Sequence, residues 1–217
     1  GIRMAEAAGA ELIFMERFYG HFLAREAMQG AGFSPYPQLD QIAAAAIVVD
    51  NTGRRFVDEG LGGIYMTNVV SRFDNPAATF TIFDRGIWEN GPGVKSVYPA
   101  NPTIERSGGT VYRADSPANL ARQLEVDPGT LTETIESYNN CLQDGSRVAL
   151  GIPRSDHAVP AAPLDTGALL AIPLVVGITN TMGGIAIDDT MRVKRPDGST
   201  IDGLYAVGGS TGGLEGG

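Results

Sequence analysis

The chain has 217 residues, of which 16 are Lys or Arg and 25 are Asp or Glu, so its formal net charge at pH 7 is −9. This acidity argues against nucleic acid or an anionic membrane surface as the main partner, because both attract clustered basic residues. No apolar run reaches the roughly 20 residues that span a bilayer, so we expect no membrane segment. A single cysteine, Cys141, excludes an internal disulfide and any cysteine-based metal site. We therefore expect a cytoplasmic protein without a metal centre.

The first quarter of the chain alternates helix and strand patterns. Residues 2–10 predict a helix that ends at Gly9, and residues 11–17 predict a strand. After a loop rich in Gly and Pro, the apolar run 43–49 ends in β-branched residues and predicts a second strand. The turn residues Asp50-Asn51-Thr52-Gly53 follow, and they indicate a β-hairpin with residues 54–57.

The middle of the chain is mainly helical, with two short strands. Residues 64–72 predict a helix, and residues 79–83 predict a strand that is followed by a short helix capped by Asp84. Residues 109–112 predict another strand. Ser116-Pro117 and Asp127-Pro128 each place a capping residue before a proline at the first helical position. Four apolar residues then define one face of the second of these helices: Leu131, Ile135, Tyr138 and Leu142.

The last part of the chain predicts a linker followed by strands and turns. Residues 151–166 are rich in Pro and Ala, strands are expected at 173–178 and 185–187, and a hairpin is expected from 191–194 to 200–201. This organisation predicts a mixed α+β module at 43–150 between two pieces of another domain, 1–42 and 151–217. Residues 50–53 and 151–166 are the expected connections of the module. The sequence stops on a glycine-rich turn after a strand, which we interpret as a fragment of a longer protein.

Two glycine pairs in this last part carry the functional information. They lie in Thr181-Met182-Gly183-Gly184 and in Gly208-Gly209-Ser210-Thr211. Glycine lets backbone amides lie against a flat or anionic ligand without a Cβ in the way. Each pair alone is explained equally well by a turn, but the ordered set is more specific.

This ordered set resembles the flavoprotein subunit family of fumarate reductase and succinate dehydrogenase, and the related ketosteroid dehydrogenases. That family has a "TMGG…D" block, a hairpin and a "GLYAxGExxGG" block, which correspond here to residues 181–188 and 203–213. Residues 47–59 (IVVDNTGRRFVDE) match the family's "ivVnxxGxRFvnE" block, and residues 9–21 match the stretch that leads to a substrate histidine. The likeness is strong at 47–59 and 173–217 and weak between them. No G-x-G-x-x-G motif of a nucleotide-binding unit occurs.

The resemblance implies a capping domain flanked by partial strands of a flavin-binding α/β domain, with FAD as cofactor. It implies hydride transfer between the flavin and an activated carbon–carbon bond of a small molecule, with an electron donor or acceptor that the sequence does not identify. His21 is the residue expected to face substrate. Tyr36 and Tyr65 are candidate proton donors, although packing explains each tyrosine as well. Eight residues are expected to bind the cofactor: Asn180, Met182, Gly183, Gly184, Gly208, Gly209, Ser210 and Thr211.

Departures from the family pattern bear on the substrate. Gly63 stands where fumarate reductases have a proton-donating Arg, Asn180 stands where they have a His, and Gly209 replaces a late Glu. Their Thr-Glu-x-x-Arg motif is also missing, since residues 35–39 read Pro-Tyr-Pro-Gln-Leu. Without arginines to pair with carboxylates, we expect a substrate less charged than a small dicarboxylate.

Two other functions are compatible with the sequence. The chain could be a catalytically silent module of such a flavoprotein, because the motif for half of the flavin site is absent. Alternatively, Gly208-Gly209-Ser210-Thr211-Gly212 fits the G-x-S-x-G elbow of a serine hydrolase, with Ser210 as nucleophile. That fold needs a histidine later in the chain, and no histidine follows Ser210.

Overall fold

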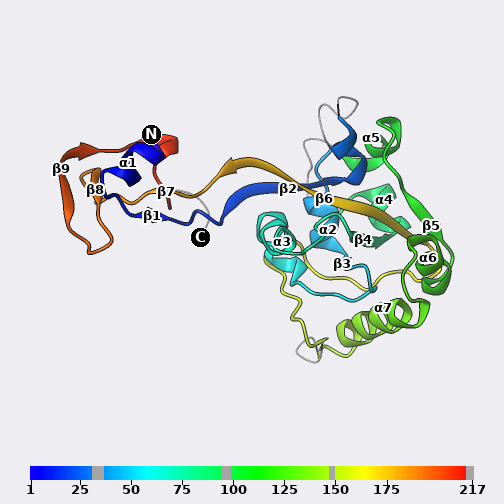
Figure 1. Ribbon diagram of the computed structural model, residues 1–217. Helices are drawn as coiled ribbons and strands as arrows, with labels where there is room; N and C mark the ends of the chain where they lie inside the picture. Colours follow the sequence, from blue (N-terminus) through cyan, green and yellow to red (C-terminus); the bar gives the residue numbers. More distant parts are fainter. Residues whose placement is uncertain (31–36, 94–98, 147–149, 214–217) are drawn as a thin grey trace. The chain divides into compact units, whose positions relative to one another are not determined.

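The computed structural model describes residues 1–30, 37–93, 99–146 and 150–213 (Figure 1). The chain divides into two units: a smaller one of residues 1–20 and 178–217, and a larger one of residues 21–177. Both contain helices and strands, so the expected α+β class is confirmed at this coarse level.

A sheet in the order β2-β6-β4-β3 organises the larger unit. Its strands are β2 (Phe18–Ala24), β6 (Leu169–Thr181), β4 (Thr79–Asp84) and β3 (Ile47–Val49), and β5 (Tyr112–Ala114) pairs with the first residues of β6. β4 is antiparallel to both neighbours, with Thr81 opposite Val48 and Ile172. Because residues 79–83 are buried throughout, β4 is the centre of the core, and the strand expected there is confirmed.

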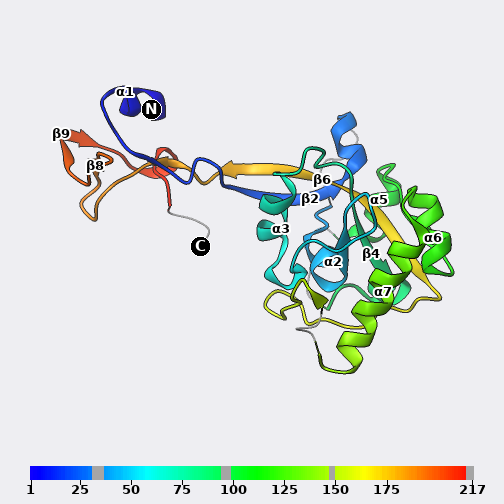
Figure 2. The same cartoon turned by 60° about the horizontal axis from the view of Figure 1, so that its bottom comes forward.

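The described helices of the larger unit are α2 (Asp40–Ala45), α3 (Gly63–Val70), α4 (Arg85–Asn90), α5 (Ala100–Arg106), α6 (Pro117–Leu124) and α7 (Pro128–Gln143). Of these, α4, α6 and α7 begin at the capping residues that the sequence predicts. Asp84 Oδ1 accepts the Ile87 N–H at 2.9 Å, and Asp127 Oδ1 accepts the Thr130 N–H at 2.7 Å. Ser116 caps α6 in the same way. α6 and α7 lie side by side (Figure 2), and α7 buries the expected apolar face except for Leu142, which is partly exposed.

Residues 43–49 are not the single strand that was expected. Residues 43–45 belong to α2, and only Ile47–Val49 form a strand. Alanine has the highest helix propensity of all residues, so the four alanines at 43–46 favour helix, and the β-branched residues alone take the strand conformation. The expected strand at 109–112 is likewise displaced to Tyr112–Ala114.

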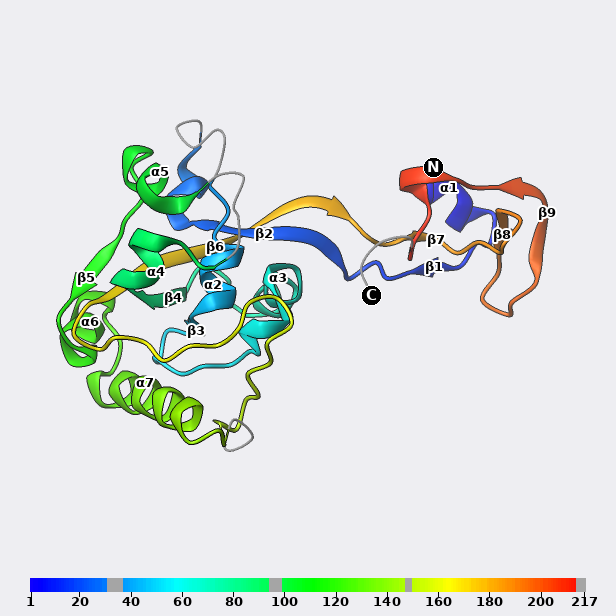
Figure 3. The same ribbon diagram turned by 180° about the vertical axis from the view of Figure 1, so that it is seen from behind.

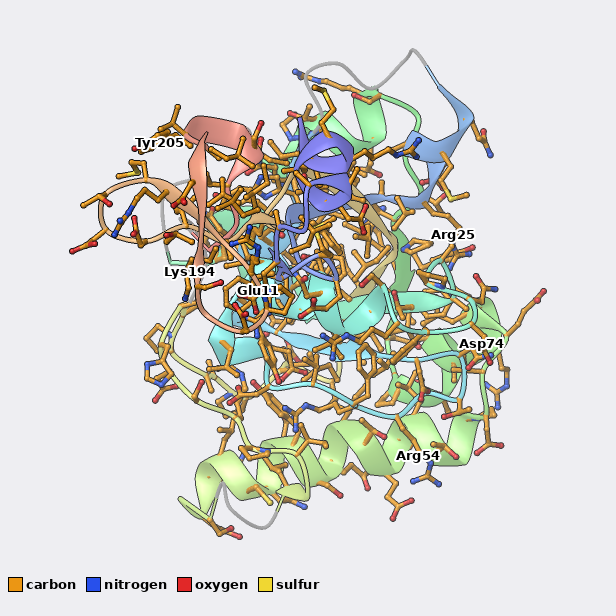
Figure 4. The ribbon with its side chains drawn as sticks, turned by 60° about the vertical axis from the view of Figure 1, so that its left-hand side comes forward. Glu11, Arg25, Arg54, Asp74, Lys194 and Tyr205 are labelled. Carbon is orange, nitrogen blue, oxygen red and sulfur yellow. The ribbon has the colours of Figure 1, made fainter. Side chains whose placement is uncertain are left out.

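The turn at residues 50–53 forms, but the hairpin around it is minimal. Asp50 Oδ1 accepts hydrogen bonds from the N–H and hydroxyl of Thr52 and from the Arg54 N–H. Beyond the turn, a single bridge joins Val49 to Arg55. Arg54 lies beside α7 (Figure 4). The turn therefore lies inside the larger unit and does not connect two domains.

Residues 151–166 lack regular structure, as expected, but they pack into the larger unit. Arg154, Val159 and Leu164 are buried. The Asn139 side chain donates to the Leu164 carbonyl at 2.9 Å and accepts the Leu164 N–H at 2.8 Å. The chain passes between the units at 20/21 and 177/178, which differs from the expected boundaries at 42/43 and 150/151. The reason is that β2 and β6 belong to one sheet and that α2 packs in the same hydrophobic core.

The smaller unit is built around a short pair of strands and a hairpin (Figure 3). α1 (Ile2–Ala7) precedes β1 (Leu12–Ile13), which pairs with β7 (Gly184–Ile185). β8 (Arg192–Lys194) and β9 (Thr200–Tyr205) form the expected hairpin. In the described part of the smaller unit, one small cluster of buried apolar residues consists of Ala5, Ala10, Ile185 and Val193. Glu11 lies next to Lys194 (Figure 4), and its N–H donates to the Lys194 carbonyl at 2.9 Å.

Two features are absent from the described part of the chain: a membrane-spanning helix and a cluster of metal-binding side chains. Within the described ranges, no helix has both the length and the apolar character needed to cross a bilayer. The same residues contain no group of three or more His, Cys, Asp or Glu side chains arranged to hold a metal ion.

Candidate functional site

His21 lies on β2, where inward and outward side chains alternate. Phe18, Phe22 and Ala24 are buried in the pattern of a strand with one face on a core, while His21 occupies the other face with 19% of its side chain exposed. Its Nδ1 lies 2.7 Å from Asp40 Oδ2. The histidine expected to face substrate is therefore held by a carboxylate that the sequence analysis did not identify.

Asp40 is the first residue of α2, and the backbone fixes its carboxylate. Oδ1 accepts the Phe22 N–H at 3.0 Å, and the Leu39 N–H donates to the Phe22 carbonyl at 2.8 Å. These two bonds tie the start of α2 to β2 at the residue next to His21. Gly63, the first residue of α3, faces Asp40, and a Cβ there would overlap the carboxylate.

The electrostatics of this pair favour the charged imidazole. The hydrogen bond that His21 donates to the Asp40 carboxylate is the largest influence and raises the pKa of His21; partial burial lowers the pKa, and the negative charge of Asp40 raises it further. The net effect is a pKa above the ordinary value of 6.5. His21 therefore keeps its proton to a higher pH than an isolated histidine, as a proton donor near neutral pH requires.

Of the two tyrosines that were expected as proton donors, only Tyr65 lies in the part of the chain that the structure describes. Tyr36 lies outside the described residues. Tyr65 lies on α3, two positions after Gly63, and is 46% exposed. Its exposure is compatible with contact to a substrate, and its role stays a prediction.

In the smaller unit, the first glycine pair is required by the chain's own backbone. A Cβ on Gly183 would lie 2.6 Å from the Phe14 carbonyl oxygen, and a Cβ on Gly184 would lie 2.6 Å from the Ser210 carbonyl oxygen. These glycines thus allow backbone segments from both ends of the chain to lie close together. Contact of this pair with FAD stays a prediction.

The second glycine pair leaves open space of the kind a flat cofactor needs. Gly208 has a φ of +67° and Gly209 follows it in a 3₁₀ turn. Apart from the adjacent residues, no atom of the described part of the chain lies within 4 Å of the Cβ position of either glycine. Both are exposed, while Thr211 is buried and its hydroxyl donates to the Gly208 carbonyl at 2.7 Å. The Thr211 hydroxyl therefore fixes the turn, while the two glycines leave its backbone exposed. This arrangement fits a planar ligand lying on the backbone.

The remaining predicted cofactor residues lie around the same segments. Asn180 is exposed near the end of β6, and Met182 is buried with its N–H donating to the Arg17 carbonyl at 3.0 Å. Ser210 does not have the geometry of a hydrolase nucleophile. A nucleophile elbow is a strained strand-to-helix turn, whereas Ser210 is not among the non-glycine residues with positive φ and closes a three-residue 3₁₀ turn.

Glu59, the last residue of the block 47–59, has a structural role that the sequence analysis missed. Its side chain is fully buried, and it accepts bonds from Arg55 Nε and from the Val48 N–H, both at 2.9 Å. Arg154 approaches the same carboxylate at 3.9 Å. Arg55 also donates to the Ile152 carbonyl at 3.2 Å. The block thus anchors residues 151–166 to the core. The i, i+4 spacing of Arg55 and Glu59 was the available sequence indication.

Comparison with known proteins decides the family. A family model described as an FAD binding domain matches residues 1–217. The chain belongs to this FAD-binding family. Its cofactor is FAD, as the glycine motifs predicted, and the expected likeness to fumarate reductases and ketosteroid dehydrogenases is confirmed.

Several relatives are oxidoreductases. Over 222 residues, the chain is 31% identical to NADH:acrylate oxidoreductase of Vibrio harveyi, covering 100% of this chain and 20% of that protein. Over 224 residues, it is 28% identical to fumarate reductase (cytochrome) of Shewanella frigidimarina, covering 100% of this chain and 34% of that protein. The chain therefore spans between a fifth and about a third of these two relatives.

Solved structures show the same fold. The structure of 3-ketosteroid delta1-dehydrogenase from Sterolibacterium denitrificans, in complex with 1,4-androstadiene-3,17-dione, aligns with a TM-score of 0.70 at 22% identity, covering 97% of this chain and 41% of that one. The open conformation of a flavocytochrome c3 fumarate reductase aligns with a TM-score of 0.51 at 21% identity, covering 98% of this chain and 34% of that one.

Proposed function

We propose that the chain forms the substrate-facing part of a flavin-dependent oxidoreductase that moves a hydride between FAD and a carbon–carbon bond activated by a neighbouring carbonyl or carboxyl group. The observation that carries this proposal is the His21–Asp40 pair, a half-buried acid–base group in a member of an FAD-binding family. In this proposal the larger unit is the capping domain, and the smaller unit belongs to the flavin-binding domain.

The two units have separate tasks in this reaction. When bound, FAD supplies the hydride donor or acceptor, and this chemistry belongs to the cofactor. The bare turn Gly208–Ser210 would hold part of the cofactor against its backbone. His21 would exchange the proton that accompanies the hydride, since the raised pKa keeps its imidazole protonated near neutral pH. Tyr65 is a second candidate for this proton, and its exposure on α3 is compatible with that role.

The substrate class follows from what the site does not offer. At Gly63, where fumarate reductases were expected to have an arginine, there is no side chain, and the Cβ position is filled by the Asp40 carboxylate. A negative group in this place disfavours a second substrate carboxylate. We therefore propose a substrate that carries at most one carboxylate. Acrylate, a monocarboxylate, is named in one relative, and 4-oxocyclohexanecarboxylate and 3-oxosteroids are named in others.

An anaerobic assay of the full-length protein tests this function. The enzyme flavin is reduced with reduced methyl viologen, and its reoxidation is followed by absorbance after addition of acrylate, cyclohex-2-enone or fumarate. We expect acrylate or the enone to reoxidise the flavin, with fumarate slower by about 10²-fold or more, the typical cost of a missing positioned acid. Fast turnover of fumarate would contradict the substrate class. A protein that binds FAD and reoxidises with none of a wider set of alkenes would be the silent module.

A further inference from the structure

We propose that Asp40 is the positioning residue of His21: it holds the imidazole through Nδ1 and thereby assigns proton exchange with the substrate to Nε2. The inference rests on the proposed function, in which His21 faces substrate, and it adds a residue that neither the glycine motifs nor the substrate histidine predicts. Its basis is the 2.7 Å contact between His21 Nδ1 and Asp40 Oδ2.

The carboxylate is itself held in place, which distinguishes positioning from a chance surface pair. Asp40 Oδ1 accepts a hydrogen bond from the Phe22 N–H at 3.0 Å, and Oδ2 accepts one from Nδ1 of the imidazole. Phe22 is fully buried and follows His21 directly on β2. One short stretch of strand therefore presents both the ring and the backbone donor to a single carboxylate, so the ring cannot turn away without breaking a fixed arrangement.

The third element around the pair, α3, is shaped to admit the carboxylate. Gly63 begins α3, and a Cβ on this residue would overlap Asp40 Oδ1, Cβ and Cγ. Any other residue at this position would push Asp40 away from His21. Gly63 thus serves the His21–Asp40 pair by its lack of a side chain.

The chemistry of imidazole places the exchangeable proton of His21 on Nε2. In the neutral ring the Nδ1 proton points to Asp40, and in the charged ring Nδ1–H still does, so Nε2 gains and loses the exchangeable proton. Asp40 raises the pKa of His21 through both its hydrogen bond and its charge. Partial burial strengthens this attraction relative to water.

The alternative is a purely structural aspartate that only joins α2 to β2. Such a residue would support folding through the Phe22 N–H, and its loss would leave the titration of His21 unchanged. The two roles therefore differ in the His21 pKa, which can be measured without turnover.

The first experiment compares Asp40→Asn with Asp127→Asn in the full-length protein. Asp127 is a matched control because its carboxylate also accepts a backbone N–H at the start of a helix. The His21 resonance of ¹³C-labelled protein is assigned by its loss in His21→Gln and titrated by NMR. We expect Asp40→Asn to lower the His21 pKa to 6.5 or below, and Asp127→Asn to leave it unchanged. We also expect kcat/KM to fall by roughly 10²–10⁴-fold in Asp40→Asn, with its pH profile moved to lower pH.

The second experiment displaces Asp40 without changing it. Gly63→Ala places a Cβ against the carboxylate in a severe overlap. Gly129→Ala, also in the first turn of a helix, brings its Cβ to 3.3 Å from Asp127 Oδ1, a tight contact that a shift of a few tenths of an ångström relieves. We expect Gly63→Ala to lower the His21 pKa and Gly129→Ala not to do so.

The outcomes separate the two proposals. An unchanged His21 pKa in folded Asp40→Asn protein, or equal titrations of Gly63→Ala and Gly129→Ala, would overturn the positioning role. A lowered pKa with an unchanged kcat/KM profile would uphold the coupling of Asp40 to His21 and overturn the proposed part of His21 in the reaction.

Discussion

Two carboxylates of the larger unit show how burial and partner decide what an acidic residue does. Glu59 is fully buried and meets the guanidinium groups of Arg55 and Arg154, which stay charged at any physiological pH. Asp40 is 17% exposed and meets an imidazole, which titrates near neutrality. The Glu59 pairs keep their charges and can serve only the fold. In the His21–Asp40 pair the imidazole can change its charge state, so this pair is suited to chemistry.

The largest expected effect comes from breaking the Glu59 pairs. Glu59→Gln leaves Arg55 and Arg154 buried without their counter-charge, and we expect a loss of about 3–5 kcal/mol in the free energy of unfolding. Urea denaturation of the full-length protein, followed by circular dichroism, measures this loss.

Glu105→Gln is the matched control for this change. Glu105 pairs with Arg113 at 3.0 Å, but its side chain is 43% exposed, so we expect a loss of at most about 1 kcal/mol. If the two variants were equally stable, the distinction between a buried tie and a surface pair would fail.

A medium effect is expected at Asp58, whose carboxylate holds two backbone N–H groups. Oδ1 accepts the Gly60 N–H at 3.0 Å and the Ser155 N–H at 2.9 Å, so it joins the Arg55–Glu59 block to residues 151–166. Asp58→Ala removes both bonds, and we expect a loss of about 1–3 kcal/mol in unfolding free energy. Hydrogen exchange near Ser155 should rise in the variant. Unchanged protection there would show that this segment is held by Arg55 and Arg154 alone.

The smallest expected effect is the pH dependence of stability that the His21–Asp40 pair produces. Because the folded-state pKa of His21 is raised above 6.5, its contribution to stability is fully present below that value and is lost as pH rises through the folded pKa. We expect the wild-type protein to lose more stability than His21→Gln over this interval. Glu59→Gln should keep the wild-type slope, since Arg55 and Arg154 do not titrate there. Parallel slopes for wild type and His21→Gln would contradict the raised pKa.

What the sequence predicted and what it missed follow from the range of the interactions. Asp84 and Asp127 cap helices through contacts three residues away, so single-sequence reasoning identified both correctly. The His21–Asp40 contact joins residues 19 apart, and it depends on the start of α2, where the sequence predicted no helix.

The expected domain boundaries differ from the limits of the two units for a related reason. The proline-rich composition of residues 151–166 indicated a linker, but Arg55, 97 positions away from Ile152, holds the segment in the core. Such a partner is not visible in local composition. The glycine motifs identified the family correctly, yet they did not distinguish Gly184, which the backbone requires, from Gly209, which lies against open space.

The pairing of β2 with β6 has a consequence for how this architecture arises. The larger unit begins at His21 and ends at Gly177, and the Cβ position of Gly177 lies 3.6 Å from the His21 carbonyl oxygen. Entry and exit are thus neighbours (Figure 1). To a host fold, an insertion with adjacent ends resembles a very short loop, so little closure entropy is lost however many residues it contains. A module of this kind can therefore be large without the conformational cost of a long open loop.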